Sequence, residues 1–428
     1  MSDSLPADLT AEMTLDFESH RQRLWEALPG DGIVILFSGR PLLRTADEEY
    51  RYAPNHNYYY LTGLDRENQV VVLTRRGSER TARLFIEPVD PHAEAWTGRM
   101  MTAEQAQSLS NIGEVETVDR WLPFVNRLIE SGHYPDVYLD LEHREWAGPP
   151  SDAIRFAHRL MEKHPGTPVA NVFPILAELR RIKSAGEIAR VRAAIAHTKA
   201  GLAAILAHTR PGVSEFQLNG HFTGTLIGGG AGLAYPPIIA TGANAAVLHY
   251  TTLRDTVQPG EVLLVDAAAE FSYYKADITR TFPADGTFTE AQRALHDLVG
   301  EASHEVMAAM RPGVPHRELQ NLTRRVLGRG MKALGYLRDE SEIGQYYFHG
   351  VSHYLGLDTH DVGEYRELEP GMVLTVEPGL YLKDHGLGVR IEDDVLITPD
   401  GVEVLSDTIP RDARAMEQWM AELQASPD

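Results

Sequence analysis

Apolar residues recur along the chain in two patterns, which together predict a mixture of helices and short strands. Helical spacing predicts helices over residues 10–28, 103–109 and 119–131. Short apolar runs predict strands in "DGIVILFSG" and "DVYLDLE", and a hairpin-like pair in "NQVVVLTRRG" and "TARLFIEPVD". The first third of the chain is therefore predicted to be an α/β domain of mixed strand order.

A capping box marks the start of a second region. Ser184 is followed three residues later by Glu187, and helical periodicity continues from there to "RPG". Beyond it, helical spacing at 214–227, 289–309 and 315–335 is mixed with strand-like runs at 236–240, 260–268, 273–282, 371–377 and 388–397. We place the domain boundary just before the capping box, so that residues 1–174 and 175–428 form two domains. The predicted fold class is α/β, of the α+β kind.

The composition limits the classes of function. Of 428 residues, 43% are hydrophobic and 24% are charged, as in soluble globular proteins. The net charge of −21 disfavours nucleic acid and anionic membranes, and no run of about twenty apolar residues could span a bilayer. The absence of cysteine excludes disulfides, thiolate zinc sites and a cysteine nucleophile. No secretory signal is visible, so we expect a cytoplasmic enzyme with no nucleic-acid or membrane partner.

Five side chains suited to metal binding stand at the end or in the middle of strand-like segments of the second region. They are Asp266, Asp277, His353, Glu377 and Glu392. The spacing of the first two acids allows two antiparallel strands that present both carboxylates on one face, and the last two acids could form a second such hairpin. Four carboxylates in one partly buried site would repel one another unless cations neutralise them. The pattern therefore predicts a site for two divalent metal ions.

Each of these residues also has an ordinary structural interpretation. Asp266 could cap a turn, Asp277 could be a solvated strand residue, and residues 392–394 could form a solvated acidic edge. The basic residues Arg180, Arg181 and Lys183 are interpreted as a solvated helix end at the domain junction. It is the conjunction of all five metal-competent residues, in this order, that favours the metal site. Motifs of zincins, serine hydrolases and phosphate-binding loops are absent from the sequence.

Four segments of the second region together resemble the metal-ligand motifs of the pita-bread metallopeptidases, in the branch of aminopeptidase P and prolidase. They are "VDAAAEFSYYKADITRTF", "HGVSHYLGLDTHD", "TVEPGLY" and "VRIEDD". Residues 38–64 and 94–100 are similar to the N-terminal domain of the same branch. The resemblance spans nearly the whole chain. It implies an aminopeptidase P-like domain over 1–174 and a catalytic pita-bread domain over 175–428.

The resemblance implies a role for each candidate ligand. Asp266 would bind one metal ion, and His353 and Glu377 would bind the other. Asp277 and Glu392 would bridge the two ions. Mn²⁺ is the expected metal and Zn²⁺ or Co²⁺ are alternatives, since carboxylate and imidazole ligands suit these ions. The ions would share a hydroxide that attacks the peptide carbonyl.

Other matched residues are implied to act on the substrate. His249 in "AAVLHYTT" and His360 in "LDTHD" would contact the carbonyl and stabilise the tetrahedral intermediate. Glu377 would also carry the proton to the proline nitrogen. His349 and Tyr381 would lie near the site, and Arg390 would be a cation close to Glu392.

The resemblance implies a metal-dependent Xaa-Pro aminopeptidase, which releases the N-terminal residue from peptides that have proline in second position. The alternative is a prolidase restricted to Xaa-Pro dipeptides. Prolidases hold the C-terminal carboxylate with an arginine, for which Arg366 is the only candidate here. Less favoured are a creatinase-like hydrolase and a non-catalytic binding protein of the same fold. Relatives of this branch form homodimers or homotetramers, and either state is expected here.

The aromatic residues of the first region have two interpretations. Tyr58, Tyr59 and Tyr60 in "NHNYYYLTG", and Trp96, could contribute to substrate access or to subunit contact. The three tyrosines could instead form an aromatic core strand.

Overall fold

The chain forms two compact units. The structure is a computed structural model that describes residues 7–142 and 148–425. Contacts within the chain separate Met1–Leu179 from Arg180–Asp428. The boundary predicted between residues 174 and 175 would fall inside the helix α7 (Phe173–Arg181), through which the chain passes from the first unit to the second. The units are described separately below.

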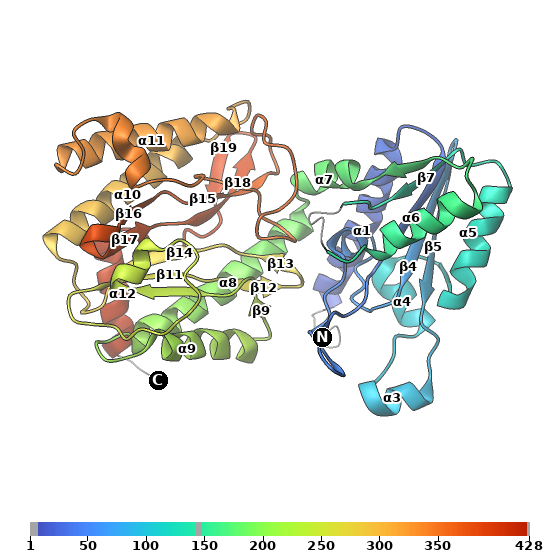
Figure 1. Cartoon of the computed structure of the whole chain (residues 1–428), viewed down its shortest axis with the longest axis horizontal. Helices are drawn as coiled ribbons and strands as arrows, with labels where there is room; N and C mark the ends of the chain where they lie inside the picture. The colour runs from blue at the N-terminus through green and yellow to red at the C-terminus, as the bar shows by residue number, and fades with distance from the viewer. Residues whose placement is uncertain (1–6, 143–147, 426–428) are drawn as a thin grey trace. The chain divides into compact units, whose positions relative to one another are not determined.

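The N-terminal unit is built on one six-stranded sheet of mixed direction (Figure 1). Its strands, in spatial order, are β6 (Glu114–Thr117), β5 (Glu79–Ile86), β4 (Val70–Arg76), β1 (Gly32–Phe37), β7 (Asp136–Leu139) and β8 (Val169–Asn171). The predicted hairpin is confirmed, because β4 and β5 pair antiparallel. The other pairs, β5 with β6, β1 with β7 and β7 with β8, are parallel. A short pair, β2 (Leu43–Thr45) and β3 (Glu48–Glu49), forms a separate hairpin.

Helices flank this sheet. Alternate residues of β1, Ile33 and Ile35, join a core with α5 (Trp121–Glu130) and α6 (Asp152–Lys163). The other helices of the unit are α1 (Ala7–Ala27), α2 (His56–Thr62), α3 (Pro91–Thr97), α4 (Ala103–Ser110) and the 3₁₀ turn η2 (Val118–Arg120). The helices predicted near 10–28, 103–109 and 119–131 are therefore confirmed within a few residues.

The tyrosine triplet belongs to a core helix, so the interpretation as a core strand is wrong in element type. Tyr58, Tyr59 and Tyr60 are 0%, 2% and 0% exposed and lie in α2. The Asn55 side chain caps the helix by accepting from the Tyr58 amide, and Gly63 ends it with φ at 69°. Three consecutive aromatic residues favour a strand by propensity, but these local caps and the surrounding core favour a helix here. Buried in this way, the triplet is not available for subunit contact.

The C-terminal unit places several small antiparallel sheets between layers of helices (Figure 1). The strands are β10 (Ile238–Thr241), β11 (Val262–Asp266) and β14 (Thr279–Pro283) in one sheet; β15 (Val373–Val376), β18 (Asp393–Thr398) and β19 (Gly401–Val404) in another; β16 (Gly379–Leu382) with β17 (Leu387–Arg390); and β9 (Gly232–Leu233), β12 (Ala269–Phe271) and β13 (Tyr274–Lys275). The helices are α8 (Ala185–His208), α9 (Glu215–Gly228), α10 (Glu290–Ala309), α11 (His316–Ala333) and α12 (Ala413–Ala425), with 3₁₀ turns η3 (Gly242–Ala246), η4 (Glu340–Gln345) and η5 (Lys383–His385).

The helix caps follow the sequence signals closely. The capping box predicted at Ser184 and Glu187 opens α8, with both of its reciprocal hydrogen bonds formed. The helices predicted at 214–227, 289–309 and 315–335 correspond to α9, α10 and α11. Residues of α10 and α11 share one hydrophobic core with the strands that carry the candidate site. Among the described residues, no helix is both long and apolar enough to cross a membrane.

Candidate active site

The first predicted pair of carboxylates lies on paired strands. Strand β11 ends at Asp266 and pairs antiparallel with β14, with Asp266 opposite Thr279. Asp277 lies two residues before Thr279, so both acids reach the same end of the pair. The connection is longer than a simple turn, because β12 and β13 form a tip that turns at Ser272 and Tyr273, both with positive φ.

The second pair of carboxylates is also placed by a hairpin. Strands β15 and β18 pair antiparallel, with Val376 opposite Asp393, and β16 and β17 continue the hairpin. Glu377 and Glu392 stand in the break between the two halves, one on each chain segment. The break frees both side chains from the regular alternation of a strand and allows them to point toward the first hairpin.

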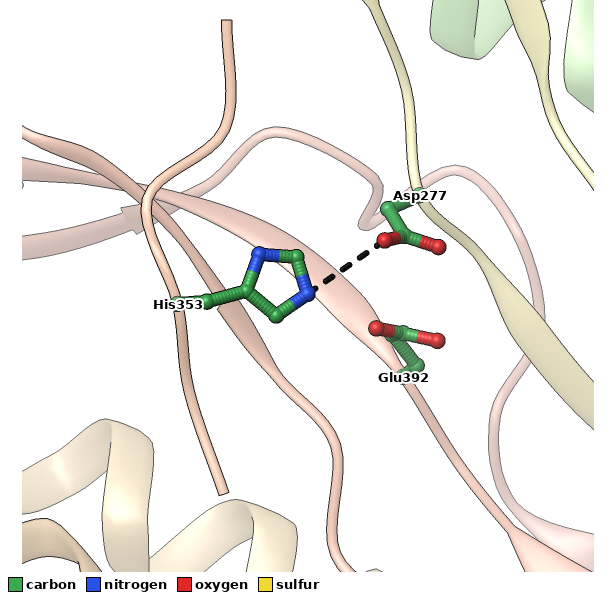
Figure 2. A group of neighbouring side chains, drawn as sticks. All are labelled: Asp277, His353 and Glu392. Carbon is green, nitrogen blue, oxygen red and sulfur yellow. Dashed lines mark ion pairs between the residues drawn. The ribbon is translucent and has the colours of Figure 1, made fainter. Parts of the chain in front are cut away.

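The two hairpins and the segment that carries His353 converge on one point. Ligand atoms of Asp277, His353 and Glu392 all lie within 4.8 Å of one another, and Figure 2 shows the three side chains directed toward a common centre. The Nε2 atom of His353 is 3.4 Å from Asp277 Oδ2 and 3.4 Å from Glu377 Oε1. The convergence predicted from five separate positions is therefore present for these four residues.

Asp266 completes the group from its other side. Its Oδ2 atom accepts a hydrogen bond from Arg390 Nη2 at 2.7 Å, and its Oδ1 atom lies 2.7 Å from the Tyr235 hydroxyl. The same hydroxyl is 2.6 Å from Asp277 Oδ1. Tyr235 therefore ties the two aspartates together. In the sequence, Tyr235 stands just before a predicted strand. That position does not distinguish it from other aromatic residues, so the sequence did not identify Tyr235 as part of the site.

All five candidate ligands line one cavity of about 380 Å³. The same cavity is lined by His249, His349, His360 and Arg390, each of which the sequence had suggested. Leu248, Gly350, Ser352 and Tyr365 complete the lining, and the sequence had not indicated these. The cavity thus combines anionic ligands, imidazoles and one guanidinium group with a few apolar atoms, as ligand sites commonly do.

Arg390 is a buried cation that pairs with Asp266 and also acts on Glu392. Its charge opposes the rise in the pKa of Glu392. Thr279 links the two residues, because its Oγ1 accepts from Arg390 Nε at 3.0 Å and donates to Glu392 Oε2 at 2.6 Å. Arg390 Nη1 donates to the Tyr381 hydroxyl at 2.9 Å. One buried cation thereby orients groups on both hairpins.

Tyr381 lies behind the cavity wall and joins Arg390 to His349. The His349 Nε2 atom is 2.8 Å from the Tyr381 hydroxyl. Burial lowers the pKa of His349 to about 4, so its ring is neutral at physiological pH. Burial also lowers the pKa of His360. Both imidazoles are therefore neutral, and that of His349 is fixed at both nitrogens, because Nδ1 donates to the Gly350 carbonyl at 2.7 Å and Nε2 accepts from Tyr381.

Arg366 is not brought to the candidate ligands. It lines a second cavity, of about 660 Å³, together with His316 and Tyr365. Its Nε atom donates to Glu364 Oε2 at 3.0 Å. Tyr365 lines both cavities, so Arg366 lies near the active-site cavity but outside it.

Burial and mutual repulsion raise the carboxyl pKa values in the cavity. Burial, reinforced by the charge of Asp277, raises the pKa of Glu377 to about 7. Burial, reinforced by the charges of Asp277 and Glu377, raises the pKa of Glu392 well above its usual range. Burial also raises the pKa of Asp266, although Arg390 opposes it. Burial lowers the pKa of His353, but its hydrogen bond to Asp277 and the charge of Glu377 outweigh this and raise it to about 9.

The donor set fits divalent metal ions. Among the described residues, Arg390 is the one guanidinium that lines the cavity, and four carboxylates line it too, so without metal ions the excess negative charge is relieved only when the acids hold protons. Divalent ions would remove this cost by coordination to oxygen and nitrogen donors. The group of Asp277, His353 and Glu392 is a compact first candidate for such ligation.

The acidic run beside Glu392 is buried, so its interpretation as a solvated edge is wrong. Glu392, Asp393 and Asp394 are 2%, 0% and 0% exposed. Asp393 accepts from Arg280 Nη2 at 2.6 Å, and Asp394 Oδ2 accepts from the Asp277 backbone amide at 3.2 Å. The run therefore holds the strand of the first hairpin in place. Sequence alternation cannot reveal this, because the partners are more than a hundred residues away.

The basic cluster at the start of the C-terminal unit is likewise buried and not a solvated helix end. Arg180, Arg181 and Lys183 are 2%, 6% and 5% exposed. Asp361 accepts from Arg180 Nη2 at 2.5 Å and from Lys183 Nζ at 3.0 Å. Since Asp361 directly follows His360, these contacts fix the loop that places His360 in the cavity.

Comparison with known proteins identifies two families along the chain. Residues 189–399 match metallopeptidase family M24, and residues 17–138 match the N-terminal domain of aminopeptidase P. The Xaa-Pro aminopeptidase of Escherichia coli K12 is 33% identical over 95% of this chain and 97% of its own length.

Solved structures agree with both matches. A provisionally identified aminopeptidase P from Bacillus anthracis has a TM-score of 0.94 and 40% identity, covering 96% of this chain and 99% of that one. Zinc-substituted Escherichia coli aminopeptidase P, in complex with product, has a TM-score of 0.86 and 31% identity, covering 96% of this chain and 98% of that one. The similarity thus extends over both units.

The metal-free cavity predicts a pH-dependent affinity for Mn²⁺. The pKa of His353 is about 9 and that of Glu377 is about 7. Below pH 9 an ion must therefore displace the proton of His353, and below pH 7 it must also displace the proton of Glu377. Apparent affinity should fall by about tenfold per pH unit below pH 9 and more steeply below pH 7. Isothermal titration calorimetry in buffers of different ionisation enthalpy measures both the affinity and the protons released.

A matched variant separates the two groups. Glu377→Gln removes one titrating group and also the charge that helps to raise the pKa of His353, so the additional steepness below pH 7 should disappear and the remaining fall in affinity should begin at a pH below 9. An affinity that is constant between pH 6 and 9 would contradict the proton-filled cavity.

Proposed function

The chain belongs to metallopeptidase family M24, in its aminopeptidase P branch, and we propose that it is a metal-dependent Xaa-Pro aminopeptidase. It releases the N-terminal residue from peptides that carry proline in second position. The observation that carries this proposal is the meeting of five ligand-competent side chains and three histidines in one cavity. The Xaa-Pro aminopeptidases among the relatives support the substrate class.

The cofactor is a pair of divalent metal ions, with Mn²⁺ favoured and Zn²⁺ or Co²⁺ as alternatives. Asp266, Asp277, His353, Glu377 and Glu392 would hold these ions, with Asp266 on one ion, His353 and Glu377 on the other, and Asp277 and Glu392 shared between them. When bound, such ions supply Lewis acidity, which polarises a carbonyl and acidifies water. The carboxylate and imidazole donors support this choice of metals, since they suit Mn²⁺ as well as Zn²⁺.

The remaining polar groups of the cavity act on the substrate. His249 and His360 donate hydrogen bonds toward the oxygen of the scissile carbonyl, where negative charge develops. Glu377 carries a proton to the proline nitrogen as the bond breaks. His349 is kept neutral by burial and oriented by Tyr381, so it adds a polar contact without adding charge. Arg390 holds Asp266 in the orientation that ligation needs.

The geometry does not favour the prolidase alternative. Arg366, the residue expected to hold a dipeptide carboxylate, is paired with Glu364 and lies outside the active-site cavity. The relatives from Haemophilus influenzae and Escherichia coli K12, which match over 95% of this chain, are Xaa-Pro aminopeptidases. A peptide that continues beyond proline therefore fits this site better than a dipeptide.

Substrate length gives the first test. With Mn²⁺ added, kcat/KM for Arg-Pro-Pro should exceed that for Gly-Pro, because Arg366 lies outside the cavity and Arg390, which lines it, is paired with Asp266. Release of the free N-terminal amino acid, followed by chromatography, measures both reactions. Arg-Ala-Ala is the matched control for proline specificity and should be cleaved poorly. Activity confined to Gly-Pro would reverse the assignment.

Asp277 gives the second test, because it touches both His353 and Tyr235. Asp277→Asn keeps the shape but removes the charge, so bound metal should fall and kcat should drop by at least about a hundredfold. Metal analysis of the purified protein and the peptide assay measure these effects.

The control for that variant is Asp384→Asn, which removes an exposed acid from the turn η5. It should leave both metal content and kcat unchanged. If Asp277→Asn retained two ions and full activity, the ligand assignment would be wrong.

We also propose that the enzyme is a cytoplasmic homodimer or homotetramer. A cysteine-free chain suits the reducing cytoplasm. Large apolar side chains are exposed on the N-terminal unit: Leu42 at 67%, Leu43 at 69%, Tyr50 at 57% and Trp96 at 81%. Exposed apolar groups of this size commonly mark contacts between proteins.

Light scattering coupled to size-exclusion chromatography tests the assembly. We expect a mass of two or four times 47.5 kDa. Leu43→Asp combined with Trp96→Asp should shift the protein toward monomer, because both changes put charge on the exposed apolar residues. Met161→Asp, at another exposed apolar position of the same unit, is the control and should not shift it. A monomeric wild-type protein would refute this proposal.

A further inference from the structure

His249 lies on a loop whose position depends on contacts made by other residues. The loop follows β10, includes the turn η3 and ends before β11. Within the part of the chain that the structure describes, no hydrogen bond holds the His249 ring, although the residue lines the active-site cavity. Its placement must therefore come from the backbone on either side.

Glu215 supplies contacts on both sides of His249. This first residue of α9 is 0% exposed. Its Oε1 atom accepts from the Thr241 amide at 2.9 Å and from Asn244 Nδ2 at 3.1 Å. Its Oε2 atom accepts from the Tyr250 hydroxyl at 2.8 Å and from the Asp255 amide at 3.0 Å.

Each oxygen of the Glu215 carboxylate accepts two of these four hydrogen bonds. Two of the donors precede His249 in the chain and two follow it, so a single side chain closes residues 241–255 into a fixed loop. Among the described residues no Lys, Arg or His forms an ion pair with Glu215, and its charge is stabilised instead by the four donors and by the N-terminus of α9. An uncharged acceptor could not satisfy the same donors equally well.

Backbone contacts strengthen the closure. The Glu215 amide donates to Asp255 O at 3.0 Å, and Ser214 forms an isolated bridge with Thr256. The Tyr250 hydroxyl also accepts from the Arg254 amide at 3.2 Å. On the opposite side, Gly388 of β17 packs so closely on the Ala245 carbonyl that a Cβ atom has no room. The loop is thus held between α9 and the strand that ends at Arg390.

We propose that Glu215 is a positioning residue for His249, which fixes the imidazole over the scissile carbonyl without touching substrate or metal. This inference rests on the proposed role of His249 in the reaction. Glu215 does not line the active-site cavity, so it acts only through the loop. If a hydrogen-bond donor is displaced by about 1 Å, it stabilises the transition state much less.

A double-mutant cycle tests the proposal. In Glu215→Gln, the amide group faces donors on one side, so two of the four hydrogen bonds cannot form. We expect kcat/KM for Arg-Pro-Pro to fall by about tenfold, mainly through kcat, with two metal ions still bound. In the His249→Ala background, Glu215→Gln should cause no further loss, because the residue that it positions is absent.

The matched control is Glu261→Gln. Glu261 accepts from Thr241 Oγ1 at 2.8 Å and from the Gln258 amide at 3.0 Å, and among the described residues it has no hydrogen bond to residues 244–255. It should leave kcat/KM within about twofold of the wild type. Tyr250→Phe, which removes one donor to Glu215, should give a smaller loss of about threefold that also vanishes in the His249→Ala background, and it serves if Glu215→Gln does not fold.

The single and double variants separate a failure of the role of His249 from a failure of the role of Glu215. If His249→Ala alone leaves kcat/KM unchanged, the proposed role of His249 is wrong and there is nothing for Glu215 to position. If His249→Ala is impaired but the Glu215→Gln and Tyr250→Phe losses add to it, Glu215 has only a structural role and the inference fails. An unchanged kcat/KM in Glu215→Gln would also overturn it.

Discussion

The mutual repulsion of carboxylates that are buried together is the constraint on which the C-terminal unit depends. Asp266, Asp277, Glu377 and Glu392 line one cavity, to which the described residues contribute a single guanidinium, that of Arg390. Such a group is stable only if protons or cations neutralise it. The strands bring the acids together, and the contacts of Tyr235 and Thr279 keep them in fixed orientations. The preference for divalent ions follows from this arrangement rather than from any one residue.

A second layer of buried charge surrounds the acids and positions the histidines. Asp361, held by Arg180 and Lys183, fixes the loop of His360. Glu215 fixes the loop of His249 in the same manner, although with neutral donors. Loops that carry catalytic groups are usually the more mobile parts of a protein. Here each histidine loop is attached to a helix or to the start of the unit by a fully hydrogen-bonded carboxylate.

The sequence was informative where a signal is local. Strand alternation and spacing predicted both hairpins, and the capping box located the start of α8. The amino-acid sequence was uninformative where the burial of a residue depends on partners that are distant in the chain. Arg180 looked like a solvated helix end, because Asp361 is far away in the chain. Tyr235 could not be recognised for the same reason. The propensity of the tyrosine triplet suggested a core strand, but its capping residues outweigh that propensity and the triplet forms a helix.

The distribution of the ligands has a consequence for the folding equilibrium. The five residues come from three segments that are widely separated in the chain, and only the folded unit brings them together. Ions that bind this arrangement and not the unfolded chain stabilise it by an amount that grows with the logarithm of their free concentration. Where divalent metal ions occupy the cavity, the resistance of the protein to heat and proteolysis therefore depends on their supply, so a shortage of these ions would remove folded molecules as well as activity.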